Sequence, residues 1–154
     1  MTQRIKYGDY ALLALRLAVG WLYFYAGLSK FLEPGWTAAG YLKGASGPFA
    51  QFFLSMSGSV MVDFLVKWGL LLIGLAIIIG IVTRFAAFWG VVITLLFYFS
   101  QFPPQHGMVE EHIVYIAAFI VLAATGIGRL FGIDGTAFMG MLVKKMRWLR
   151  WLVA

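Results

Sequence analysis

Four apolar segments of membrane length limit the folds that this chain can adopt. They are Tyr10–Ser29, Phe64–Val82, Phe85–Phe102 and His112–Phe131, and a bilayer core needs roughly 20 apolar residues of helix. Hydrophobic residues make up 62% of the 154 residues and charged residues 12%, whereas soluble domains hold about 45–50% apolar residues. The sequence therefore predicts an all-α integral membrane protein, folded as a four-transmembrane-helix bundle.

The connections between these segments differ in kind. Thr83 and Arg84 alone separate the second and third segments, which predicts a tight antiparallel hairpin. Pro103–Glu111 ends one helix with prolines and begins the next with two acidic residues, which suit the positive end of a helix dipole. The first connection, Leu32–Asp63, is too long and too apolar for a solvated loop, so we expect a short interfacial or re-entrant helical segment over the outer mouth of the bundle.

Basic residues are distributed unequally between the two ends of the bundle. One side would carry Arg4, Lys6, Arg84, Arg129, Lys144, Lys145, Arg147 and Arg150, and the other Lys30, Lys43 and Lys67. The positive-inside rule then predicts a multi-pass protein of the plasma (inner) membrane with both termini cytoplasmic. We expect residues 1–135 to form the membrane domain and residues 136–154 a basic amphipathic helix on the inner leaflet. Tryptophans among these cations favour a lipid surface over a nucleic-acid partner.

The first segment carries two cations, Arg16 and Lys30, on the same face as Tyr23 and Gly27. An arginine at mid-bilayer costs roughly 2.5–3.5 kcal/mol unless it meets a partner or reaches the interface. Small residues on the same face let a neighbouring helix approach closely. The sequence therefore predicts that this face points into the bundle, with Arg16 bonded to Asp134 or to a freed backbone carbonyl.

Polar side chains are expected to converge at the outer end of the bundle. A quinone ring needs hydrogen-bond donors or a protonatable group at its carbonyls beside an apolar channel. The candidates for catalysis are Lys30, Glu111 and His112, and those for cofactor binding are Arg16, Tyr23, Tyr98, Gln101 and Tyr115. Lys30 and Glu111 are expected to form a charge pair beneath the first outer loop. The alternative interpretation is that these residues are interfacial anchors and helix caps.

No metal site or iron cofactor is expected in this chain alone. His106, Glu110, Glu111 and His112 supply suitable ligand types, but adjacent residues of a helix point about 100° apart. The chain's 2 histidines lie near one end of one helix, which does not suit a bis-histidine haem. The chain has no cysteine, so it holds no thiolate-bound iron–sulfur cluster.

Several motifs resemble the DoxX/DoxD family in order and spacing. They are ALRLAVGWLYFYAGLSKFLEPGW in the first segment, TAAGYLKGASGPFAQFF in the first loop, VKWGLLLIGLAIIIGIVTR in the second segment, Tyr98–Pro104, EEHIVY at Glu110–Tyr115 and GIGRLFGIDG at Gly126–Gly135. The polar residues that match the family pattern are Arg16, Lys30, Glu111, His112, Arg129 and Asp134. The resemblance assigns none of them a catalytic role.

The resemblance implies a four-helix membrane bundle and, in the DoxD branch, the membrane subunit of a thiosulfate:quinone oxidoreductase. The implied cofactor is a quinone, and the implied partners are the lipid bilayer and a second, DoxA-like subunit, with a homo-oligomer as an alternative. A thiosulfate dianion would meet Lys30, Lys43 and the backbone amides around Gly44–Pro48. The second interpretation is a non-catalytic membrane scaffold or small-molecule carrier, in which Arg16 and Lys30 only lock the bundle.

Overall fold

Three long apolar helices and one shorter apolar helix form the body of the protein. The computed structural model describes residues 7–104 and 107–153, so Arg4, Lys6 and His106 lie outside the described residues. The helices α1 (Tyr7–Leu32), α4 (Val60–Ile79) and α5 (Thr83–Ser100) are long and apolar enough to cross a membrane, and α6 (Glu111–Thr125) is the shorter one. An all-helical protein is confirmed: β-type pairing in the described ranges is limited to one isolated bridge, between Ser46 and Gln101.

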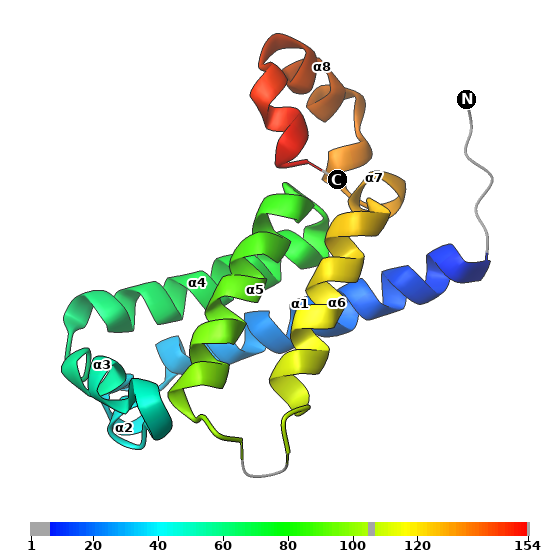
Figure 1. Ribbon diagram of the computed structural model, residues 1–154. Coiled ribbons are helices and arrows are strands. Elements are labelled where there is room, and N and C mark those ends of the chain that lie inside the picture. The colour runs from blue at the N-terminus through cyan, green and yellow to red at the C-terminus, as the bar shows by residue number, and fades with distance from the viewer. Residues whose placement is uncertain (1–6, 105–106, 154) are drawn as a thin grey trace.

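Short helices occupy the two ends of this body. They are α2 (Ala39–Lys43), η1 (Gly47–Phe49), α3 (Ala50–Ser55), α7 (Ile127–Phe131), η2 (Ile133–Gly135), α8 (Ala137–Lys145) and η3 (Arg147–Trp151). The predicted helical segment in the first loop is therefore present as α2, η1 and α3, and the predicted C-terminal helix as α8. In Figure 1, α2 and α3 lie at the end opposite α8.

The four longer helices pack as two pairs that cross each other. Helix α1 packs mainly on α4, and α5 packs mainly on α6 (Figure 1). Glycines form the α1–α4 contact: a Cβ added at Gly27 would meet the backbone of Leu71, and one added at Gly74 would meet the backbone of Phe24. Backbones that approach this closely gain van der Waals contact, which drives helix association in lipid.

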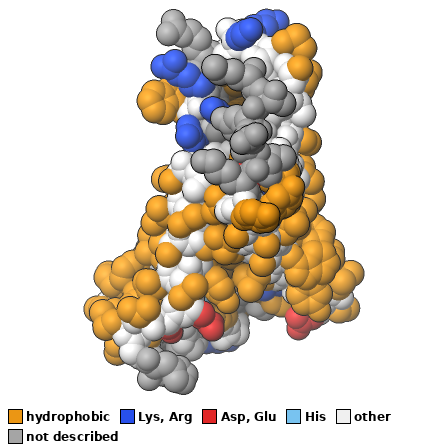
Figure 2. Space-filling view, turned by 90° about the vertical axis from the view of Figure 1, so that its right-hand side faces the viewer, with side chains coloured by type: hydrophobic (Ala, Val, Ile, Leu, Met, Phe, Trp, Pro, Cys, Tyr) orange, Lys and Arg blue, Asp and Glu red, His pale blue; other side chains and the backbone are white. Residues whose placement is uncertain are grey.

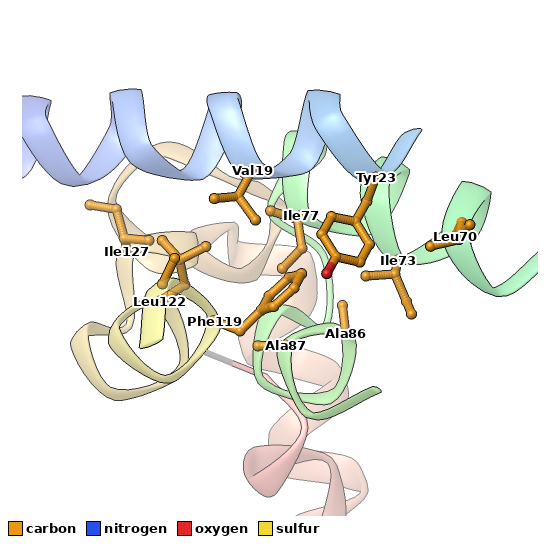
Figure 3. Packing of buried hydrophobic residues seen from close by; sticks show 11 residues of the cluster. Val19, Tyr23, Leu70, Ile73, Ile77, Ala86, Ala87, Phe119, Leu122 and Ile127 are labelled. Atoms are coloured by element: carbon orange, nitrogen blue, oxygen red, sulfur yellow. The ribbon is translucent and has the colours of Figure 1, made fainter. Parts of the chain in front are cut away.

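A small aromatic and aliphatic core lies where the two pairs cross. Phe119 and Leu122 of α6 are fully buried against Val19 and Tyr23 of α1, as Figure 3 shows. The Tyr23 and Phe119 rings meet edge to face with centroids 4.9 Å apart. By contrast, large hydrophobic side chains cover the flanks of the molecule (Figure 2). This surface is typical of a protein that contacts lipid around its circumference.

The expected hairpin between the second and third segments is present, but its turn precedes Thr83 and Arg84, which belong to α5. Helix α4 ends at Ile79, and Gly80 (φ 67°) and Val82 (φ 43°) both adopt the left-handed conformation before α5 begins at Thr83. The turn is capped from a distant part of the chain, because the carboxylate of Asp134 accepts the backbone N–H groups of Val82 (2.7 Å) and Thr83 (2.9 Å). A carboxylate at a helix N-terminus also complements the helix dipole.

The expected fourth segment, His112–Phe131, is not one continuous helix. Gly126 adopts the left-handed conformation (φ 64°) and ends α6, and α7 begins at Ile127. Helix α6 alone is about 22 Å long at 1.5 Å per residue, which is shorter than a bilayer core of about 30 Å. The last carbonyls of α6 lose their helical donors at this break, and those of α7 lose theirs where it ends at Phe131, so other groups must satisfy them.

Arg16 bonds two carbonyls of α7. It is 2% exposed, and its guanidinium donates to the carbonyl oxygens of Ile127 (3.2 Å) and Phe131 (2.7 Å). The nearby Asp134 carboxylate interacts favourably with its charge. The prediction that Arg16 bonds Asp134 or a freed carbonyl is therefore confirmed by its carbonyl bonds, and α1 is joined through them to the chain that follows α6.

Candidate functional site

A pocket of 340 Å³ lies at the end of the bundle covered by α2, where α1, α4, α5 and α6 meet. Its walls are mostly aliphatic and aromatic. A small set of side chains that carry N–H or O–H groups also lines it: Tyr23, Lys30, Trp36, Tyr41, His112 and Tyr115. A volume of about 300–1,000 Å³ and apolar walls with few polar groups are typical of small-molecule sites. This pocket is the strongest candidate site in the described part of the chain.

The first loop forms the roof of the pocket, and two of its backbone amides donate to the bundle. The backbone N–H of Ala38 donates to the Asp63 carboxylate of α4 (2.7 Å), and that of Ser46 donates to the Ser100 carbonyl at the end of α5 (3.0 Å). Ala38 is also buried with Leu42 and Phe53 in a separate apolar cluster within the loop. The roof therefore has its own core and is held against both α4 and α5.

Replacing Asp63 with alanine is expected to loosen this roof without unfolding the bundle. A hydrogen bond to a charged group contributes about 1.5–3 kcal/mol, so amide exchange of Ala38–Lys43 should accelerate about tenfold or more. Hydrogen exchange with mass spectrometry measures this directly. Asp63→Asn keeps an acceptor oxygen and should show a smaller increase. Unchanged exchange in Asp63→Ala would mean that the loop cluster and the bonds of Ser46 and Tyr41 hold the roof without Asp63.

Lys30 places a positive charge at the edge of the pocket. Its Nζ donates to the Ala26 carbonyl of its own helix (2.9 Å) and lies 5.3 Å from the centroid of the Trp36 ring. Lys67 lies at the same distance from that ring but does not line the pocket. An ammonium has three N–H donors, and the bond to Ala26 uses one of them. Lys30 therefore retains donors for a ligand, whereas Lys67 provides a matched cation outside the pocket.

His112 and Glu110 form a proton-carrying pair at the pocket. The Nδ1 atom of His112 lies 2.9 Å from a carboxylate oxygen of Glu110, and both side chains are partly buried. The bond orients the imidazole ring and leaves Nε2 for another partner. A histidine held by a carboxylate is a common arrangement for transferring a proton at neutral pH.

Three tyrosines complete the polar lining, with different roles. The Thr94 hydroxyl donates its hydrogen to the Gly90 carbonyl, so it accepts a hydrogen bond from the Tyr23 hydroxyl. The Tyr23 hydroxyl is therefore used within the core. Tyr115 packs edge to face on Tyr23, with ring centroids 6.3 Å apart. The Tyr41 hydroxyl donates to the Phe97 carbonyl (3.3 Å). Burial raises the pKa of Tyr41, so its phenol stays protonated at neutral pH.

The pocket brings together only half of the predicted site residues. Those that line it are Tyr23, Lys30, His112 and Tyr115, and those that do not are Arg16, Tyr98, Gln101 and Glu111. Arg16 lies at the other end of the bundle, bonded to Ile127 and Phe131. Tyr98 donates instead to the Met108 carbonyl (3.1 Å), and Gln101 pairs with Ser46 of the loop. These contacts give Arg16, Tyr98 and Gln101 structural roles.

The expected Lys30–Glu111 charge pair is wrong. Within the described residues the one ion pair of this region joins His112 to Glu110, and Glu111 is exposed. The ammonium of Lys30 turns back to its own helix and to Trp36 instead. Because α6 begins at Glu111, Glu110 precedes the helix and its extended backbone allows the side chain to reach His112.

The expected anion site around Gly44–Pro48 is also not supported. The amides of Gly44, Ala45 and Ser46 donate to the carbonyls of Tyr41, Leu42 and Ser100, respectively. Pro48 has no amide hydrogen. These three amides therefore stabilise the roof rather than point to a ligand.

Comparison with known proteins identifies the family. The family model described as DoxX matches residues 11–102. The chain belongs to the DoxX family. No curated protein and no solved structure matches it. The matched region of this DoxX-family chain contains Lys30, Trp36 and Tyr41, whereas His112 and Tyr115 lie beyond it.

The chain is a multi-pass membrane protein, because it belongs to the DoxX family and has three helices long and apolar enough to cross a membrane. In the ranges that the structure describes, no three His, Asp or Glu side chains come together as a metal site requires. The polar groups that line the pocket are hydrogen-bond donors, with N–H and O–H groups, rather than a set of metal ligands. They suit a ligand with carbonyl or hydroxyl oxygens and an apolar body.

Proposed function

We propose that this DoxX-family protein is the membrane subunit of a quinone-linked oxidoreductase and binds the quinone ring in the pocket beneath α2. The observation that carries the proposal is the combination of apolar walls with Lys30 and the His112–Glu110 pair in one pocket. Both predicted functional groups, a cation and a protonatable histidine, are among its lining residues. A quinone ring with its isoprenoid tail has the matching chemistry.

Each polar group has a role in this proposal. A bound quinone accepts two electrons and two protons, one proton at each carbonyl oxygen. Lys30 would hold one oxygen, stabilise the negative charge that develops there and give that oxygen its proton. Nε2 of His112 would deliver a proton to the other oxygen, and Glu110 would hold the imidazole ring and stabilise its charged form. The roof of α2 and Trp36 would limit the access of water.

The proposal includes a position in the membrane. We propose that α6 and α7 together complete a fourth span and that both termini are cytoplasmic, which puts the pocket at the outer end. Arg16 bonds the α7 carbonyls of Ile127 and Phe131, and Arg84 bonds the Ala123 carbonyl that the break at Gly126 frees, as backbone at membrane depth requires. The apolar loop helices α2 and α3 would then lie at the outer interface.

The electron donor is proposed from the resemblance to the DoxD branch. Two thiosulfate ions lose two electrons as the S–S bond of tetrathionate forms, and the quinone takes up these electrons with two protons. The chain has no cysteine to form a thiol intermediate. A DoxA-like second subunit is proposed as the partner that completes this reaction.

Quinone binding tests this proposal against the scaffold interpretation, and thiosulfate-dependent quinone reduction tests it against the carrier interpretation. In lipid nanodiscs the purified protein is expected to bind a short-tailed quinone, and Lys30→Met and His112→Gln should each weaken binding about tenfold or more. The reason is the loss of one hydrogen bond to a charged or polar group, which contributes about 1.5–3 kcal/mol when charged. Titration calorimetry gives the dissociation constants.

Two matched controls sharpen the test. Lys67→Met removes the other cation beside Trp36, and Glu111→Gln removes the exposed acid next to Glu110. Neither should change the dissociation constant. Absence of quinone binding to the wild type, or equal binding by all variants, would contradict the proposal and favour the non-catalytic scaffold or carrier.

A further inference from the structure

We propose that the outward-facing groove between α5 and α6 binds an acyl chain of an anionic phospholipid, whose phosphate is held by Arg84. The groove has a volume of 490 Å³ and is separate from the quinone pocket, with which it shares no lining residue. Arg84 supplies its charge, and the remainder of its lining is apolar. The inference does not depend on the proposed oxidoreductase function.

The groove is a consequence of uneven side-chain size along the α5–α6 contact. The buried ring of Phe119 packs on Gly90 and forms part of the lining, and Ala87 and Ala124 leave space beside it. Phe88 of α5 and Ile120 of α6 also line the groove, with 59% and 56% of their surfaces exposed. An apolar groove of this depth at a lipid-facing surface is filled by hydrocarbon, because an empty one would lose dispersion contacts.

Arg84 is held at one end of this groove by a bond that leaves its phosphate-binding atoms unused. Its Nε–H donates to the Ala123 carbonyl of α6 (3.2 Å). That carbonyl lies in the last turn of α6, where the break at Gly126 removes the usual helical donors. In the described residues the two terminal nitrogens of Arg84 have no recorded acceptor, and their planar arrangement matches two oxygens of a phosphate.

The surroundings of Arg84 favour a negatively charged head group. The backbone N–H of Phe85, the next residue, donates to the Leu152 carbonyl (3.2 Å), which places the basic C-terminal segment beside the start of α5. Figure 2 shows most of the visible Lys and Arg side chains at the end that carries α8. A basic groove between membrane helices at the more positive end is the usual setting for anionic lipid.

Native mass spectrometry of the full chain tests the proposal with two probes, phosphatidylglycerol and phosphatidylcholine with the same acyl chains. We expect the wild type to retain phosphatidylglycerol preferentially. Arg84→Gln should reduce that retention about fivefold, which is the effect of one basic residue near an anionic lipid, and Arg84→Lys should retain most of it. Arg129→Gln removes an exposed cation outside the groove and should change little.

A second pair of variants tests the acyl-chain site. Ala124→Phe fills the groove and should reduce the retention of both lipids, whereas Ala18→Phe, at an exposed position of α1 outside the groove, should not. Equal retention of the two lipids by the wild type, or equal losses in Arg84→Gln and Arg129→Gln, would overturn the proposal. A dimer that Ala124→Phe dissociates, with lipid retention unchanged, would also overturn it and assign the groove to a second copy of the chain.

Discussion

Replacing Arg16 with leucine is expected to lower the free energy of unfolding by about 3–5 kcal/mol, the usual cost of removing one partner of a buried charge pair. The variant would lose both bonds to the carbonyls of Ile127 and Phe131 and leave the buried Asp134 less well compensated. Unfolding in detergent, followed by helical circular dichroism during titration with a denaturing surfactant, measures the change.

Two further substitutions show how much of this destabilisation comes from the charge of Arg16 and how much from its hydrogen bonds. Arg16→Lys keeps the positive charge but lacks the forked donors that reach two carbonyls. Its free energy of unfolding should therefore fall, but by less than that of Arg16→Leu. Arg129→Leu removes an exposed arginine of α7 and should leave stability nearly unchanged. If Arg16→Leu were as stable as the wild type, the guanidinium would be binding lipid phosphate rather than the bundle interior.

Adding a single methyl group at Gly74 is expected to lower the free energy of unfolding almost as much. In Gly74→Ala the new Cβ would meet backbone atoms of Phe24 and the carbonyl of Gly20, which cannot move without separating α1 from α4. Overpacking usually costs about 1–3 kcal/mol, and here the upper end is expected because the obstacle is backbone. The same surfactant titration provides the measurement.

Gly69 offers the control for this prediction on the same helix. A Cβ at Gly69 would lie 3.5 Å from the end of the Ile93 side chain, which is an ordinary contact. Gly69→Ala should therefore be neutral or slightly stabilising, because alanine favours helix more than glycine does. Equal stabilities of the two alanine variants would show that the α1–α4 contact is looser than the structure describes.

The architecture of the bundle was largely predictable because lipid imposes simple rules on polar and small residues. Arg16, Tyr23 and Gly27 share one face of the first segment, and all three are buried. The break at Gly126 was not predictable, since a glycine inside an apolar segment is common in membrane helices. The segment that follows Gly126 bonds to Arg16, which lies more than 100 residues away in the chain, and local sequence does not reveal such a contact.

The candidate site was predictable only in outline. Helical periodicity indicates which residues share a face, and it correctly grouped Tyr23 with Lys30. It does not indicate which neighbouring element fills that face, so Tyr98 was placed in the site although its hydroxyl bonds to Met108. Trp36 and Tyr41 were missed because they come from a loop without regular periodicity. The one sequence feature that could have indicated them was the aromatic character of that loop.

The position of Asp134 in the chain bears on the order in which this protein is completed during synthesis. Residues 11–102, which match the DoxX family, include Arg16, Val82 and Thr83 but none of the groups that satisfy them. A nascent chain that stops at Thr125 would contain all four apolar helices and still expose an unpaired guanidinium and an uncapped hairpin. The bonds of Arg16 and the cap of the hairpin therefore form only after the ribosome has delivered residues 127–134.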